Sequence, residues 1–154
     1  MLGKVLPFLL LLSLLLTPLV SGCGGGAADG ETAAMADSRV PKMAPLEHMP
    51  HEVQKAPQAV REAYQFAAAS PEIVEQLPCY CGCGTFGHTS NYDCYVAGVD
   101  PDGTITYDMH AIGCAICVDI TQDAMAQMRR GKSLAEIKNY VEVKYAQYGP
   151  STMP

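Results

Sequence analysis

Apolar residues recur at helical spacing in the segment 57–69. Val60, Tyr64 and Ala67 or Ala68 are three to four positions apart, which places them on one face of an α-helix. A proline opens the segment, and proline suits the first helical turn because its missing N–H group would have no partner there. The spacing therefore predicts a helix that ends near residue 69.

A shorter helix is predicted directly afterwards, in the segment 70–77. It begins with serine and proline, a typical cap followed by a typical first helical residue. Its apolar residues are Ile73, Val74 and Leu77. Pro78 disfavours helical backbone angles at the residue before it, so we expect the chain to leave the helix at this proline.

Two β-prone runs lie on either side of a turn sequence. The runs cover residues 94–99 and 104–107, and Asp-Pro-Asp-Gly stands between them at 100–103. Aspartate, proline and glycine in this order favour a tight turn, whereas branched and aromatic residues favour strands. The sequence predicts a small β-hairpin here.

Two longer helices are predicted in the C-terminal part of the chain. The first opens with Cys114 and Cys117 and ends at an arginine pair followed by Gly131, as is typical of helix ends. The second starts with a capping-box sequence at 133–136. We therefore predict a mainly α fold with a small β-hairpin (α+β), in which four helices surround a cysteine-rich loop. The apolar stripe of the last helix is Leu134, Ile137, Val141, Tyr145 and Tyr148.

The first 22 residues have the features of a bacterial export signal. Lys4 precedes a leucine-rich run over residues 5–16, which is shorter than the roughly 18 apolar residues of a membrane span. The sequence Ser-Gly-Cys at 21–23 resembles the bacterial lipobox, which implies cleavage before Cys23 and attachment of a lipid to it. The alternative is an uncleaved apolar anchor. We expect an exported protein, lipid-anchored to the cell membrane on its extracytoplasmic face.

The expected organisation has one folded domain. The whole chain is expected to comprise a lipoprotein signal peptide (1–22), a lipidated flexible tether (23–54), a cysteine-rich metal-binding domain (55–149) and a short tail (150–154). The formal net charge is −6, and cleavage would remove one lysine, leaving nine basic against sixteen acidic side chains. A negative surface disfavours nucleic acid as a partner and is compatible with cation binding.

Six of the seven cysteines lie within about forty residues. Three of them alternate along the run Pro-Cys-Tyr-Cys-Gly-Cys-Gly at 78–84. On an extended chain, Cα atoms two residues apart are separated by about 6.6 Å, near the upper limit for a disulfide, and their side chains share one face. These three thiols are therefore poor disulfide partners for one another and suitable neighbours around a common ion. The six residues are Cys79, Cys81, Cys83, Cys94, Cys114 and Cys117.

Three interpretations of these thiols are open. Outside the cytoplasm thiols tend to oxidise, so the six could form three structural disulfides. Cys114 and Cys117 are three apart at a predicted helix start, which favours thiolates and could serve a thiol-disulfide oxidoreductase, although no βαβ pattern surrounds them. The third interpretation is a metal site.

The number of thiols favours copper among the metals. A tetrahedral zinc site uses four donors, so six thiols exceed the needs of one zinc ion. Soft thiolates in excess favour several Cu(I) ions, because bridging sulfurs let one set of ligands hold more than one ion. Zinc is the alternative metal. His110 and His88 are candidate further ligands, or else histidines that only donate hydrogen bonds or face solvent.

The predicted tether contains a second set of soft donors. Thioether and imidazole groups suit copper, and prolines at 41, 45 and 50 are expected to keep this segment out of helix. The alternative is a proline-rich linker in which these side chains are incidental. The possible accessory metal ligands are Met43, His48, Met49 and His51.

The motif Pro-Cys-Tyr-Cys-Gly-Cys at 78–83 gives the chain a family resemblance. Together with His88, Cys94, His110 and the Cys-Ala-Ile-Cys run at 114–117, it resembles the family named after its PCYCGC motif. That family consists of secreted or lipid-anchored bacterial proteins, largely of unassigned function. The resemblance covers roughly residues 54–148 and leaves out the tether. It implies a family and says little about activity.

The sequence as a whole predicts a metal-binding protein without enzyme machinery. Its function is expected to be storage, buffering or hand-over of Cu(I) outside the cytoplasm. The expected partners are the membrane, through the lipid on Cys23, and a copper transporter or copper enzyme. The alternatives are a zinc-stabilised or disulfide-stapled structural domain and, second, a thiol-disulfide oxidoreductase.

Overall fold

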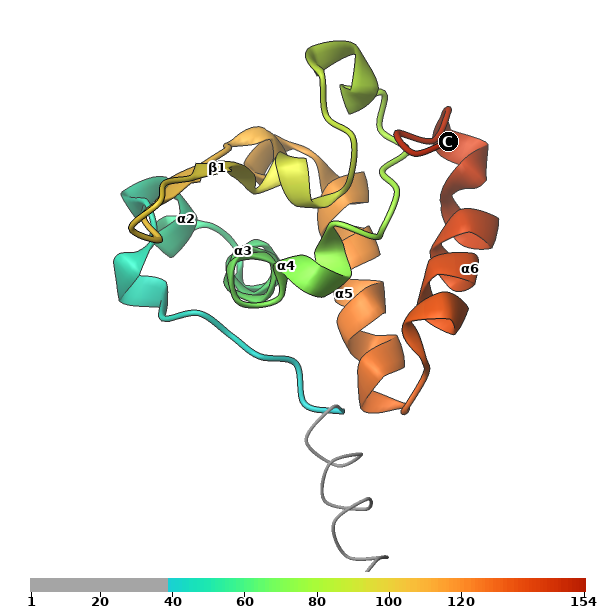
Figure 1. Cartoon of the computed structure of the whole chain (residues 1–154), viewed down its shortest axis with the longest axis horizontal. Helices are drawn as coiled ribbons and strands as arrows, with labels where there is room; N and C mark the ends of the chain where they lie inside the picture. The colour runs from blue at the N-terminus through green and yellow to red at the C-terminus, as the bar shows by residue number, and fades with distance from the viewer. Residues whose placement is uncertain (1–38) are drawn as a thin grey trace, which may run out of the picture. The chain divides into compact units, whose positions relative to one another are not determined.

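Residues 39–154 are described by a computed structural model of the chain, shown in Figure 1. They form a mainly α fold with one two-stranded hairpin, which confirms the predicted fold class. The four expected helices correspond to α3–α6, and α2 is an additional short helix. The elements are α2 (His51–Lys55), α3 (Gln58–Ala69), α4 (Pro71–Val74), β1 (Val96–Val99), β2 (Ile105–Tyr107), α5 (Ala115–Arg129) and α6 (Leu134–Tyr145).

The predicted export signal and Cys23 lie outside the described residues. Within residues 39–154, no helix is both long enough and apolar enough to cross a bilayer.

The core lies between α5 and the helices on either side of it. Helix α5 contacts α3 and also α6, which runs beside it (Figure 1). Tyr64 and Ala67, two of the residues expected on the apolar face of α3, are fully buried. On the other side, the Tyr145 hydroxyl donates to Asp123 Oδ2 at 2.6 Å and joins α6 to α5. The 3.6-residue spacing thus identified Tyr64, Ala67 and Tyr145 as buried residues of these helix faces.

Residues 39–54 are not an open linker, and the prediction that their prolines prevent helix is wrong. The segment contains a 3-10 turn, η1 (Leu46–His48), and helix α2, which starts directly after Pro50. Proline is tolerated at a helix start, where no N–H donor is needed. Met49 and Val53 are buried in the core, so the folded part begins before the expected position near residue 55.

Helix ends follow the local signals in most places. The Ser133 side chain accepts from the Glu136 N–H group while the Glu136 carboxylate accepts from the Ser133 N–H group, so the predicted capping box is present. Gly131 has φ +76°, a left-handed angle that suits the residue after the C-cap of α5. Tyr148 was expected to continue the stripe of the last helix, but it lies in a 3-10 turn and is 57% exposed.

Two predicted elements are shorter in the structure. Helix α4 ends at Val74, although Leu77 is buried as expected. The first strand begins at Val96, with Val96 paired to Tyr107. Cys94 was expected in this strand and instead ends a 3-10 turn, η3 (Tyr92–Cys94). Cys94 therefore precedes the hairpin, and it is fully buried.

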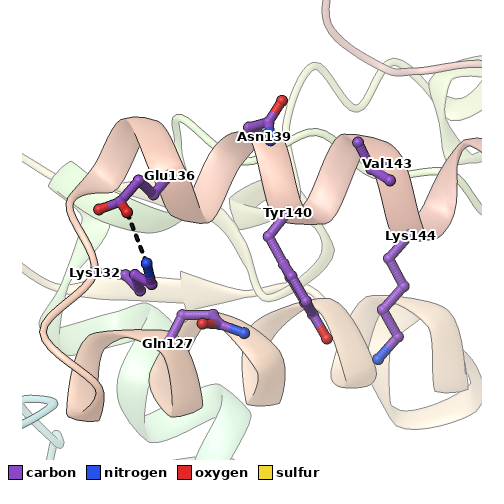
Figure 2. A pocket seen from close by; sticks show the side chains of 7 residues that line it. All are labelled: Gln127, Lys132, Glu136, Asn139, Tyr140, Val143 and Lys144. Atoms are coloured by element: carbon purple, nitrogen blue, oxygen red, sulfur yellow. Dashed lines mark hydrogen bonds and ion pairs between the residues drawn. The ribbon is translucent and has the colours of Figure 1, made fainter.

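A surface pocket of about 580 Å³ lies along α6 and the C-terminal half of α5 (Figure 2). The cysteines, by contrast, lie at the N-terminal end of α5. The pocket residues are Gln127, Lys132, Glu136, Asn139, Tyr140, Val143 and Lys144.

Candidate metal centre

The thiol loop follows α4 and turns sharply at glycine. Gly82 has φ +85°, in the left-handed region that glycine adopts without strain, and it precedes the 3-10 turn η2 (Cys83–Phe86). The run 79–83 is therefore wrapped rather than extended. Because the chain changes direction at this bend, the alternate thiols point toward one place.

The other thiols come from two further segments. Cys94 closes η3, Cys114 is the N-cap of α5, and Cys117 lies in the first turn of that helix. Cys79, Cys94 and Cys117 are fully buried. Three segments that are distant in sequence thus deliver sulfur to one place.

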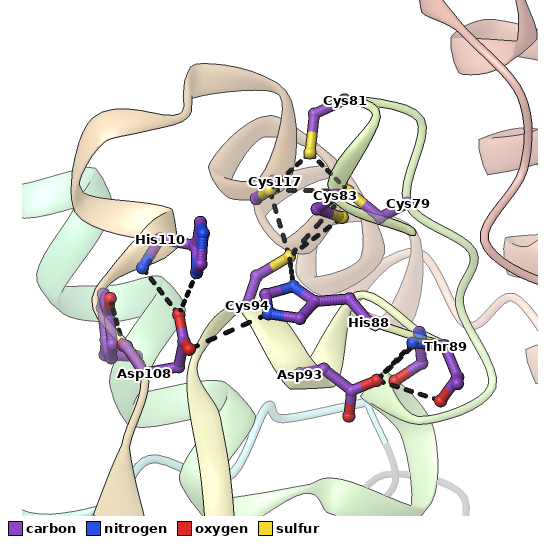
Figure 3. Close-up of polar contacts among 12 residues, drawn as sticks. Cys79, Cys81, Cys83, His88, Thr89, Asp93, Cys94, Asp108, His110 and Cys117 are labelled. Atoms are coloured by element: carbon purple, nitrogen blue, oxygen red, sulfur yellow. Dashed lines mark hydrogen bonds and ion pairs between the residues drawn. The ribbon is translucent and has the colours of Figure 1, made fainter. Parts of the chain in front are cut away.

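Four of the sulfur atoms form two triangles on a common edge (Figure 3). The Sγ atoms of Cys79, Cys81 and Cys117 are separated by 3.4 Å (79 to 81), 3.4 Å (79 to 117) and 3.5 Å (81 to 117). Cys94 Sγ completes the second triangle, at 3.3 Å from Cys117 and 4.0 Å from Cys79. The Cys79–Cys117 edge belongs to both triangles.

The network extends beyond these four sulfurs. Cys83 Sγ is 3.7 Å from Cys94 Sγ, and His88 Nδ1 is 3.5 Å from the same atom. Cys83, His88 and Cys94 form one set whose ligand atoms lie within 4.8 Å of one another, and Cys81, Cys114 and Cys117 form another. All six cysteines therefore belong to one connected network.

These separations suit metal ligands. The six cysteines are free thiols, and their closest approach of 3.3 Å is far longer than the disulfide bond of about 2.05 Å. Four sulfurs that bind one tetrahedral ion at about 2.3 Å would lie roughly 3.8 Å apart. The observed distances of 3.3–4.0 Å are close to that value. The three sulfurs of either triangle are therefore spaced as ligands of one metal ion would be.

Hydrogen bonds within the network lower the pKa of one thiol and raise the pKa of others. Bonds with Cys117 and then Cys94 hold the pKa of Cys79 far below its usual value, which outweighs the opposite effect of burial. The bond with Cys79 raises the pKa of Cys117 most strongly, and burial raises the pKa of Cys83. The network thus lowers the pKa of one buried thiol, Cys79, and raises the pKa of two others, Cys117 and Cys83.

The two histidines occupy different positions relative to the sulfurs. His88 contacts Cys94 through Nδ1 and points Nε2 toward Asp108 Oδ2, at 3.8 Å. His110, in contrast, makes no hydrogen bond with a cysteine sulfur of residues 39–154; its Nδ1 lies 2.7 Å from Asp108 Oδ1. It groups with His88 and Asp108 instead of with thiols.

The four soft donors predicted in the tether do not gather at this centre. Met49 is buried in the hydrophobic core. His48 and His51 are exposed, and Met43 is 39% exposed. Neither histidine belongs to a group of potential ligands within residues 39–154.

A buried polar network beneath the sulfurs was not anticipated from the sequence. The Tyr95 hydroxyl donates to the Cys117 carbonyl at 2.8 Å and lies 2.7 Å from Thr121 Oγ1. Asn91 Nδ2 also donates to Thr121 Oγ1, at 2.7 Å. Because Thr121 is one turn after Cys117 on the same helix face, helical spacing could have placed it near the cluster. These bonds hold the first turn of α5 in position.

The C-terminal tail covers the start of the thiol loop. The Cys79 N–H group donates to Thr152 Oγ1 at 2.9 Å, and the Thr152 N–H group donates to the Cys79 carbonyl at 3.0 Å. The tail approaches closely at Gly149, where an added Cβ would lie 2.8 Å from the Tyr80 carbonyl oxygen. No sequence signal predicted this contact.

The variant Gly149→Ala is expected to displace the tail from the thiol loop. The new methyl group would overlap a backbone oxygen, so we expect a loss of roughly 1–3 kcal/mol in the free energy of unfolding and faster alkylation of the thiols. Urea denaturation and timed alkylation would measure both. Gly98→Ala is the matched control, because nothing lies within 4 Å of its Cβ. Equal behaviour of the two variants would contradict the role of the tail.

Comparison with known proteins identifies the family but gives no function. A family model described as "Protein of unknown function with PCYCGC motif" matches residues 11–154. This range is wider than the expected 54–148 and includes the segment before α2. No curated protein and no solved structure matches the chain. Since the match covers nearly the whole chain, including the motif at 78–83, the chain belongs to the PCYCGC family.

Proposed function

We propose that this protein binds several Cu(I) ions through its six-cysteine network and stores, buffers or hands them over outside the cytoplasm. The observation that supports this most is the size of the network. Two sulfur triangles share the Cys79–Cys117 edge, and Cys83 and Cys114 extend the network beyond the four donors of one tetrahedral ion. Shared thiolates are the means by which one set of ligands holds several soft monovalent ions.

Burial and charge support a cation-filled cluster. Three of the thiols are fully excluded from water, and burying several thiolates is unfavourable unless cations balance them. Cys81 and Cys114 are only partly buried. We propose that ions enter and leave at these two outer thiols, from which a copper transporter or copper enzyme could receive them.

The buried position of Cys79 favours binding over thiol-disulfide exchange. Exchange requires a thiolate to attack the sulfur of a substrate disulfide in line. Cys79 is the thiol with the lowered pKa, yet it is fully buried beneath neighbouring sulfurs and the C-terminal tail. A substrate disulfide could not approach this sulfur without opening the fold.

We further propose that the protein is exported and attached to the cell membrane through a lipid on Cys23. The supporting sequence is the apolar run followed by Ser-Gly-Cys at 21–23. Expression in a bacterium, followed by membrane fractionation and mass spectrometry of the mature N-terminus, tests it. The wild-type protein should carry a lipid and remain with the membrane, and Cys23→Ser should lose the lipid. An unmodified Cys23 in the wild type would refute the proposal.

The copper proposal is tested by counting ions. The full chain, kept reduced and free of oxygen, is titrated with Cu(I) against a competing chelator. Cys23→Ser is titrated in parallel, so that only the six clustered thiols contribute. We expect more than one tightly bound Cu(I) per chain in both proteins.

Two other results would refute it in favour of the alternatives. One zinc ion held by four thiolates, with no tight binding of Cu(I), would indicate a zinc-stabilised domain. No bound metal, with the six thiols paired in natively purified protein, would indicate a disulfide-stapled domain.

A further inference from the structure

His88, Asp108 and His110 form a polar cluster beside the sulfur network (Figure 3). One nitrogen of each histidine and one carboxylate oxygen lie within 4.8 Å of one another. Asp108 Oδ1 is 2.7 Å from His110 Nδ1, and Asp108 Oδ2 is 3.8 Å from His88 Nε2. One carboxylate therefore faces both imidazoles through its two oxygens.

These distances are close to those of ligands on one ion. Nitrogen and oxygen donors about 2.0–2.2 Å from a tetrahedral zinc-sized ion lie roughly 3.3–3.6 Å apart. The observed 2.7 Å and 3.8 Å lie on either side of that range, so small side-chain rotations would bring the three donors to one centre. Two imidazoles and a carboxylate suit borderline divalent ions, whereas thiolates suit soft monovalent ones.

The surroundings hold the two imidazole rings in place. The edge of one ring faces the other, with His88 and His110 ring centroids 4.7 Å apart. The Phe86 ring lies 5.1 Å from that of His110. Side-chain exposure rises outward, from 10% at His88 and 19% at Asp108 to 43% at His110. The cluster is thus mostly buried on its inner side and open to solvent on its outer side.

We infer that His88, Asp108 and His110 form a separate binding site for a divalent cation of the zinc class, at the solvent-facing edge of the sulfur network. Solvent would complete the coordination on the exposed side. The inference does not rest on the metal proposed for the thiols, because none of the three donors is sulfur.

His88 links this site to the thiols. Its Nδ1 lies 3.5 Å from Cys94 Sγ, so when Nε2 binds the divalent ion, the Nδ1–H group is directed at that sulfur. A histidine ligand commonly donates its second ring N–H group to a neighbouring acceptor, which fixes the tautomer. Occupation of the divalent site would therefore hold His88 as a hydrogen-bond donor to the sulfur network instead of as one of its ligands.

The test counts zinc in matched variants of the full, reduced chain. Zn²⁺ is titrated against a chromophoric chelator with the wild type, Asp108→Asn, His110→Gln and His51→Gln. We expect the first two variants to lose one zinc equivalent, or to bind it at least about tenfold more weakly, and to keep the zinc held by thiolates. His51 is exposed and belongs to no ligand group in the described residues, so His51→Gln should match the wild type. Asp108→Asn keeps the backbone carbonyl that accepts from the Tyr64 hydroxyl.

Nitrogen-15 NMR of labelled histidine rings identifies the ligands directly. We expect Zn²⁺ to shift the ring nitrogens of both His88 and His110. A shift at His88 alone would mean that it is a ligand of the sulfur network, and this result would overturn the inference. Unchanged zinc stoichiometry in Asp108→Asn and His110→Gln would overturn it as well. Neither outcome depends on whether the thiols bind Cu(I).

Discussion

Replacing both Cys79 and Cys117 with serine is expected to abolish the binding of multiple Cu(I) ions. These two sulfurs form the edge common to both triangles, at 3.4 Å, so their loss leaves no intact triangle around that edge. Serine is nearly isosteric but offers a hard oxygen donor, which a soft monovalent ion does not favour. Anaerobic titration of Cu(I) against a competing chelator would measure the number of ions per chain.

The single variant Cys114→Ser is the control, because it removes a thiol that does not belong to the shared edge. Cys114 is partly buried and groups only with Cys81 and Cys117. It should lower the stoichiometry by one ion at most. Thermal unfolding of both variants establishes whether they remain folded. If the folded double variant bound as many ions as the wild type, the edge-sharing arrangement could not be the basis of binding.

Leu77→Ala is expected to cause the largest loss of stability among single apolar substitutions near the thiol loop. Leu77 is fully buried, and removing a buried leucine side chain typically costs about 2–5 kcal/mol because a cavity remains. Its carbonyl also accepts from the Asn91 N–H group at 2.8 Å. Since the thiol loop begins two residues later, we expect weaker metal binding together with the lower stability.

Urea denaturation with matched substitutions would isolate the cavity effect. Leu77→Met keeps the volume and should cost less than about 1.5 kcal/mol. Val143→Ala removes methyl groups from a side chain that is 77% exposed, so its effect should stay within about 0.5 kcal/mol. Similar losses in Leu77→Ala and Val143→Ala would contradict the assignment of Leu77 to the core.

Much of the fold was predictable because its signals are local. The capping box joins Ser133 to a residue three positions later, and the left-handed angle at Gly131 needs only the absence of a Cβ. The turn at 100–103 is likewise specified by its own residues. Such elements depend on neighbours in sequence, so the sequence identifies them reliably.

The errors occurred where a distant partner decides the outcome. The sequence around Met49 is proline-rich, as in a linker. Met49 is nevertheless buried, because this segment packs against the helices. The Ala44 N–H group donates to the Gln65 carbonyl, and the Gln65 side chain donates to the Ala44 carbonyl. Tyr148 matched the helical spacing of the stripe, but it is exposed because it does not pack against the core. The spacing of apolar residues cannot show whether another part of the fold packs against that face.

The sequence by itself determined the kind and number of donors: six thiols at spacings that place them in three short segments, and glycines that let the first segment bend. Only the tertiary structure decided which sulfurs share an edge, that Asp108 faces both histidines, and that the tail covers Cys79. The physical reason is that the covalent chain restricts the distance between two donors only when both lie in the same short segment. Between segments, distances depend on how the helices pack around α5.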